Sequence, residues 1–192
     1  MPTIFSVYSV GDSLITFLRD TYPEPLRTEH PCEFRLISSG ELEEKQDMGT
    51  AVTLYLYRMD IDKHSRNTPH PQHPKERPNP LPLSLYYLFI IWADTPLAEN
   101  SIAAWLMSQM HQYPILDQST LSSSGGWRPD DQVSIVPIEM TNEDLMRLWD
   151  AMTPTYRLSL PYLARVVRID PDNFVESRPV VATRYGYGER AE

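Results

Sequence analysis

The stretch from Leu81 to Ala93, LPLSLYYLFIIWA, restricts the possible folds of this chain more than any other. It is too short to span a bilayer, which takes about 20 apolar residues in a helix. Its aromatic and β-branched residues favour a strand over a helix. With a period of two, both faces of this strand are apolar, so the sequence predicts a central strand covered on both sides. One face holds Leu83, Leu85, Tyr87, Phe89 and Ile91, and the other holds Tyr86, Leu88, Ile90 and Trp92.

The composition excludes several classes of protein. The 192 residues suffice for a single domain, with an expected core at about residues 4–170 and a C-terminal tail at 171–192. The formal charge of −9 argues against nucleic acid or an acidic membrane surface as a partner, and we expect no direct membrane insertion. The one cysteine, Cys32, cannot form an internal disulfide, which agrees with a reducing cytoplasm. The first residues lack the basic start and apolar run of a secretion signal.

Further periodic stretches predict the neighbours of the central strand. Residues 3–20 carry one apolar stripe at helical spacing, and Thr95 followed by Pro96 begins a second helix as N-cap and first-turn proline. Thr141 begins a third, short helix with a capping box that has Asp144 at its third position. Further strands are expected at Cys32 to Ser38, Thr50 to Met59, Gln132 to Met140 and Leu158 to Ile169, of which Thr50 to Met59 should pair with the central strand.

Two polar segments are predicted to be surface loops. The acidic stretch from Ser39 to Gly49 should be solvated, and the serine- and glycine-rich stretch from Ser119 to Arg128 should be flexible. In the helix that begins at Thr95, we expect Met107 and Met110 to fill the core rather than to bind a ligand.

The segment from Asp60 to Pro82 is too long for a tight hairpin and too rich in proline for regular structure. It carries His64, His70 and His73, so a metal site is one interpretation. No cysteine lies nearby and the spacing matches no common ligand pattern, which favours ordinary polar loop composition instead. A long loop on a compact domain more often contacts partners.

No group of residues in the sequence indicates catalysis. We find no phosphate-cradling glycine loop, nucleophile elbow or paired-cysteine motif. His111 has no placed partner, and sequence adjacency alone does not align Cys32 with His30 as a nucleophile and its base. We therefore expect no enzymatic activity, no cofactor and no bound metal.

Three stretches, taken in order, resemble a known family. They are TLYLYRM followed by Arg66-Asn67, then RPNPLPLSLYYLFIIWAD, then the block from EDLMRLWDAM through YRLSLPYLARVVRI. Over about Ile4 to Asp170, the chain is similar to the tail-terminator, or cap, proteins of extracellular contractile injection systems of the antifeeding-prophage type.

The resemblance implies an α/β (α+β) fold in which helices flank a central mixed, largely antiparallel sheet. It also implies a homohexameric ring that ends the inner tube and joins it to the sheath, within a phage tail-like particle assembled in the cytoplasm of the producing bacterium. The family has no catalytic residues. The candidate partner contacts are Arg66, Asn67 and Arg77 in the long loop, and Arg178 and Arg184 in the tail.

The tail itself has two interpretations. Arg178 to Tyr185 is a possible further strand that could be added to a neighbouring subunit, whereas a loosely attached terminus fits the same residues.

Three other functions are compatible with the sequence. The first is a terminator or completion protein of a contractile phage tail, which the neighbouring genes would distinguish. The second is a monomeric adaptor whose proline-rich loop docks in extended form. The third is a metal-binding protein that uses His64, His70 and His73, which metal analysis would test.

Overall fold

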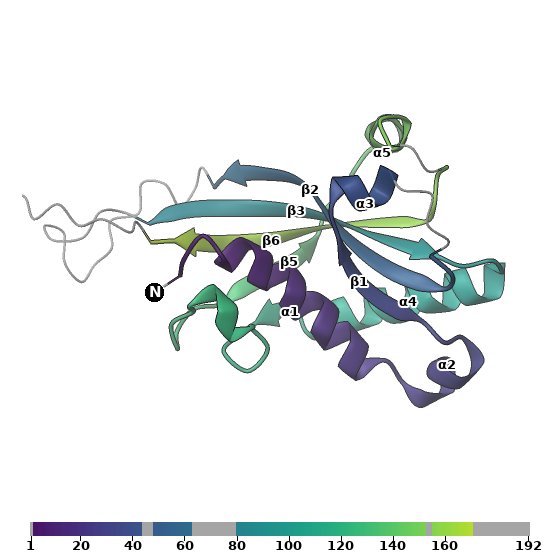
Figure 1. Ribbon diagram of the computed structural model, residues 1–192, viewed down its shortest axis with the longest axis horizontal. Coiled ribbons are helices and arrows are strands. Elements are labelled where there is room, and N and C mark those ends of the chain that lie inside the picture. Colours follow the sequence, from purple (N-terminus) through teal and green to yellow (C-terminus); the bar gives the residue numbers. More distant parts are fainter. Residues whose placement is uncertain (1, 44–47, 63–79, 153–154, 171–192) are drawn as a thin grey trace, which may run out of the picture.

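The computed structural model describes residues 2–43, 48–62, 80–152 and 155–170 (Figure 1). Within them a six-stranded sheet has the order β1-β2-β3-β6-β5-β4. β1 and β2 are parallel and all other neighbours are antiparallel, which confirms the prediction of a mixed, largely antiparallel sheet with flanking helices. The elements are α1 (Ser6–Thr21), α2 (Glu24–Glu29), β1 (Glu33–Ile37), α3 (Ser39–Glu43), β2 (Ala51–Ile61), β3 (Leu81–Trp92), α4 (Pro96–Gln112), β4 (Ile115–Leu116), the 3₁₀ helix η1 (Ser123–Gly125), β5 (Val133–Pro137), α5 (Asn142–Asp150) and β6 (Ser159–Ile169).

β3 lies in the middle of the sheet and is buried on both faces, as its sequence predicts. It pairs with β2 on one side and with β6 on the other over nearly its whole length. Tyr87 and Phe89 point into the larger of two apolar clusters, whereas Leu88, Ile90 and Trp92 belong to the smaller cluster on the opposite face. The two-residue period of a strand therefore divides one apolar sequence between two cores.

Helices cover the two faces unequally. α1 and α4 lie on one face of the sheet, and the shorter α3 and α5 lie on the other (Figure 1). α1 buries the stripe that contains Val10, Leu14 and Leu18. α4 buries its own stripe through Ile102, Leu106 and Met110.

α4 and α5 begin at the predicted N-caps. The Thr95 hydroxyl oxygen accepts a hydrogen bond from the Ala98 amide at 3.3 Å, and the Thr141 hydroxyl oxygen accepts one from the Asp144 amide at 3.1 Å. The Thr141 hydroxyl also donates to the Asp144 carboxylate at 2.8 Å. Side-chain oxygens at these positions satisfy amides that the first helical turn leaves unpaired.

The prediction for Met107 is wrong, whereas that for Met110 is confirmed. Met110 is 2% exposed, but Met107 is 50% exposed because it lies on the side of α4 that faces away from the sheet.

The prediction of a solvated loop at Ser39 to Gly49 is also wrong where the structure describes it. Residues Ser39–Glu43 form α3, and Leu42 and Met48 are buried in the smaller core. Ser38 begins the helix, because its amide and its hydroxyl donate to the Glu41 carboxylate at 2.8 and 2.9 Å. Ser38 and Glu41 have the S-x-x-E spacing of a capping box, so a sequence signal for α3 was present.

The stretch from Ser119 to Arg128, predicted to be flexible, instead packs against α1. The Trp127 indole donates to the Ser9 hydroxyl oxygen at 2.9 Å, and the Ser122 amide donates to the Ser13 hydroxyl oxygen at 2.8 Å. A Cβ at Gly125 would lie 2.3 Å from the Trp127 ring nitrogen, so glycine permits this close approach. These hydrogen bonds join residues more than a hundred positions apart in the sequence, so local composition cannot predict them.

We predict that Thr53→Val destabilises the domain by about 1–3 kcal/mol, because it leaves the buried Trp92 indole without its acceptor. Trp92 Nε1 donates to Thr53 Oγ1 at 2.9 Å, and Thr53 is fully buried. Urea denaturation measures the effect. On a Trp92→Phe background the same Thr53→Val change should cost less, and equal costs on both backgrounds would contradict the assigned hydrogen bond.

Candidate partner-contact surfaces

The predicted contact residues Arg66, Asn67, Arg77, Arg178 and Arg184 lie outside the described residues. The same is true of the histidines of the long loop, His64, His70 and His73. The structure does describe the points where these segments leave the sheet. These points show where the two segments begin.

Both segments start at the same end of the sheet. At this end Ile61 of β2 is paired with Leu83, and Leu81 of β3 is paired with Ile169 of β6. The loop from β2 to β3 and the tail after β6 therefore emerge side by side, at the end where the three longest strands extend beyond α3 and α5 (Figure 1). The sequence predicted the two segments separately and could not show that their starting points are neighbours.

The starting points of both segments are held in place. The Asp62 amide donates to the Pro82 carbonyl at 2.9 Å, and the buried Asp62 carboxylate accepts from the Ser84 hydroxyl at 3.2 Å. Asp170 forms an ion pair with Arg128, and its amide donates to the Pro2 carbonyl at 2.9 Å.

At this end of the sheet, the strands expose apolar side chains. Met59, Ile61 and Leu81 are 51%, 49% and 42% exposed. On the opposite face Arg58 forms an ion pair with Asp60 and lies over the ring of Tyr86, 4.9 Å from its centroid.

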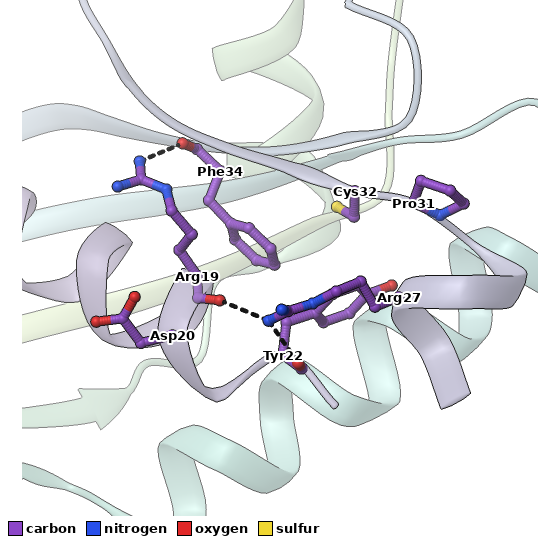
Figure 2. A pocket seen from close by; sticks show the side chains of 7 residues that line it. All are labelled: Arg19, Asp20, Tyr22, Arg27, Pro31, Cys32 and Phe34. Carbon is purple, nitrogen blue, oxygen red and sulfur yellow. Dashed lines mark hydrogen bonds between the residues drawn. The ribbon is translucent and has the colours of Figure 1, made fainter. Parts of the chain in front are cut away.

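A second candidate surface is an open hollow of about 420 Å³ between α1, α2 and the start of β1 (Figure 2). Two guanidinium groups border it, but both hold the backbone. Arg19 donates to the Phe34 carbonyl at 2.9 Å, and Arg27 donates to the Tyr22 carbonyl at 3.0 Å. The Tyr22 hydroxyl donates to the His30 carbonyl at 2.8 Å. These bonds fix the turn that leads from α1 into β1, and they supply a structural role for the polar groups of the hollow.

The electrostatics of the hollow do not favour nucleophilic chemistry at Cys32. Burial raises the pKa of the Cys32 thiol to about 12, and burial also raises the pKa of Tyr22 to about 12. A thiol with this pKa stays protonated at neutral pH, and the thiolate is the nucleophilic form.

Within the described ranges, no cluster of three or more His, Cys, Asp or Glu side chains is arranged to hold a metal ion. The same part of the chain has no helix of the length and apolarity that a membrane crossing requires.

Comparisons with known proteins give one family match. Residues 9–183 match the family described as the Pvc16 N-terminal domain. A comparison with curated protein sequences gives no match.

Two solved structures have a similar fold. The cryo-EM structure of the sheath/tube terminator of an extracellular contractile injection system, PVC, in its extended state has a TM-score of 0.59 and 19% identity. The match covers 100% of this chain and 66% of that chain. The cryo-EM structure of the anti-feeding prophage cap, the AFP tube terminating cap, has a TM-score of 0.60 and 16% identity, over 93% of this chain and 60% of that chain. The chain therefore spans less than two thirds of the length of either structure.

We predict that the Cys32 thiol of the folded protein reacts at pH 8 at least about 100-fold more slowly than an unburied thiol, because its thiolate fraction is small. The rate of reaction with a chromogenic disulfide measures this. The same protein in 6 M guanidinium chloride is the control, and it should react at the rate of a free cysteine. Folded and unfolded rates within tenfold of each other would contradict the raised pKa.

Proposed function

This chain belongs to the family of Pvc16 N-terminal domains, and from this premise we propose that it is a tail terminator of a contractile injection system. In this role it ends the inner tube and the sheath and joins the two. The observation that carries the proposal is the likeness in fold, over 100% and 93% of the chain, to two separate tube terminators. A terminator of a contractile phage tail remains the alternative within the same class.

The proposed assembly is a homohexameric ring with head-to-tail contacts. Such a contact joins two different surfaces of the same chain, and it closes into a ring when the rotation between copies allows. The two edges of the sheet differ from each other, as a contact between unlike surfaces requires. β4, with two residues, forms one edge, and β1 followed by the uncovered end of β2 forms the other.

We assign tube and sheath contacts to the loop with Arg66, Asn67 and Arg77, and a further partner contact to the tail with Arg178 and Arg184. The common origin of both segments at one end of the sheet supports this assignment. The charge of the loop supports it too, because an otherwise acidic chain has a basic segment there. Residues 63–79 contain Lys63, Arg66, Lys75 and Arg77 against the acidic Glu76.

The proposed role is structural and includes no catalysis. Residues 1–192 act as a single unit, which is made in the cytoplasm of the producing bacterium and built into a phage tail-like particle. The raised pKa of the Cys32 thiol and the backbone contacts of Arg19 and Arg27 support this view, since they give these groups of the hollow a structural role.

Light scattering after size exclusion, with negative-stain imaging, tests the proposal. We expect a ring of six-fold symmetry, formed by the protein alone or at the end of added tube and sheath. A protein that stays monomeric with tube and sheath present, and leaves their lengths unchanged, would contradict the terminator role.

We predict that Arg66→Ala combined with Arg77→Ala weakens attachment to tube and sheath at least about tenfold, because charge-assisted hydrogen bonds contribute roughly 1.5–3 kcal/mol each. Particle length by electron microscopy and co-sedimentation with tubes measure the loss. Arg147→Ala is the matched control, since Arg147 is a well-exposed arginine on α5. The urea midpoint should not change in either variant. Particles of normal length with both loop arginines removed would exclude this loop as the contact.

A further inference from the structure

Among the residues that the structure describes, the outer edge of β2 has no neighbour along its second half. β1 pairs with β2 from Ala51 to Tyr55 and ends there, whereas β2 continues to Ile61. On its inner side this second half stays paired with β3, after a bulge between Leu56 and Arg58. Within the described residues, no strand pairs with the outer side of residues 56–61.

The direction of the backbone groups follows from the ladder with β3. The Asp62 amide donates to the Pro82 carbonyl of β3. Because residues of an antiparallel strand alternate between the two sides, the amides and carbonyls of Met59 and Ile61 point away from β3. In the described part of the chain they have no backbone partner. An edge of this kind is a template for an added strand.

The surroundings of this edge are apolar on one face. Met59 and Ile61 are about half exposed there. Tyr8 on α1 and Ile4 just before it, 59% and 65% exposed, stand three and seven residues before Gly11, which lies against Leu36 of β1. An added strand in line with β1 would lie over this strip and remove it from water. The charged side chains of this edge, Arg58 and Asp60, lie on the opposite face, so on this face the edge carries only Met59 and Ile61.

We propose that this edge of β2 is a strand-acceptor site, and that its occupant is the segment Arg178 to Tyr185 of a second copy of this chain. The inference rests on the proposed function, because it specifies the contact between neighbouring copies in the ring. The added strand would pair with the free amides and carbonyls of Met59 and Ile61.

The sequence of the tail matches the chemistry of the two faces. The segment RPVVATRY is rich in β-branched residues. With a period of two, Arg178 and Arg184 share one face, and Val181 and Tyr185 share the other. The apolar face would then lie over Met59 and Ile61, and the arginines would lie on the face that carries the Arg58–Asp60 ion pair.

A neighbouring copy is the better donor than the chain's own tail. The own tail could span the distance, because crossing from β6 to the outside of β2 takes about 14 Å and eight extended residues reach about 26 Å. The start of the chain lies beside the start of this path, however, because the Asp170 amide donates to the Pro2 carbonyl just before α1. Exchange between copies also gives the unlike donor and acceptor surfaces that a head-to-tail ring needs.

Cross-linking between two differently tagged full-length chains tests the proposal, with Cys32 replaced by alanine in both. One chain carries Ile61→Cys and the other Val181→Cys, and a short bis-maleimide is added with tube and sheath subunits present, so that the ring can form. We expect a mixed dimer that contains both tags. Leu97→Cys replaces Ile61→Cys as the matched control. Leu97 is 68% exposed and lies just after the opposite end of β3, so it should give at least tenfold less mixed dimer.

Two variants at one position separate the backbone contact from loss of a side chain. Met59→Pro removes the outward amide and spares the ladder with β3, whereas Met59→Thr loses the methionine side chain and keeps the amide. We expect Met59→Pro to abolish the mixed dimer and Met59→Thr to retain it. Unchanged cross-linking in Met59→Pro would overturn strand addition at this edge.

The outcomes also separate this inference from the proposed function. A chain that carries both Ile61→Cys and Val181→Cys tests pairing within one copy. If tube and sheath are still capped but only this chain cross-links, and only internally, the tail pairs with the edge of its own copy. The inference is then overturned while the function stands. If the mixed dimer equals the Leu97 control, the inference is likewise overturned. If no capping and no ring occur, both the function and the inference are overturned.

Discussion

The burial of β3 on both faces is the constraint on which the rest of the structure depends. A strand whose side chains are apolar on both sides must have paired strands at both edges and cover over both faces. β2 and β6 provide the pairing. α1 and α4 cover one face through Tyr87 and Phe89, and α3 and α5 cover the other through Leu88 and Ile90. The helices are therefore placed where this strand requires them.

The uneven cover explains where contacts with partners can form. The helices protect the half of the sheet that holds the two cores, and the long strands continue beyond α3 and α5 (Figure 1). At that end the loop from β2 to β3 and the tail after β6 emerge together, from starting points held by Asp62 and Asp170. At this end the larger core still covers one face through Leu83 and Val167, so only the face of α3 and α5 is left open there among the described residues.

Signals that are local in the sequence predicted their elements well. The two faces of β3 and the caps at Thr95 and Thr141 depend on neighbours within a few residues, and each is found as predicted. α3 was missed although its signal was local too, because the capping pair Ser38 and Glu41 lies within a strongly polar stretch. The order of three motifs also sufficed to identify the family that residues 9–183 match.

The sequence by itself determined the strands longer than two residues, which faces of β3 are apolar and which family the chain belongs to, because these follow from spacing and residue type. The tertiary structure alone decided which sheet edge stays open. β1 ends opposite Tyr55 while β2 continues to Ile61, and no period in the sequence shows that difference. The same is true of the loop that Trp127 and Ser9 join to α1. Pairing between distant residues sets edges and loop contacts, and it is decided only when the whole chain has packed.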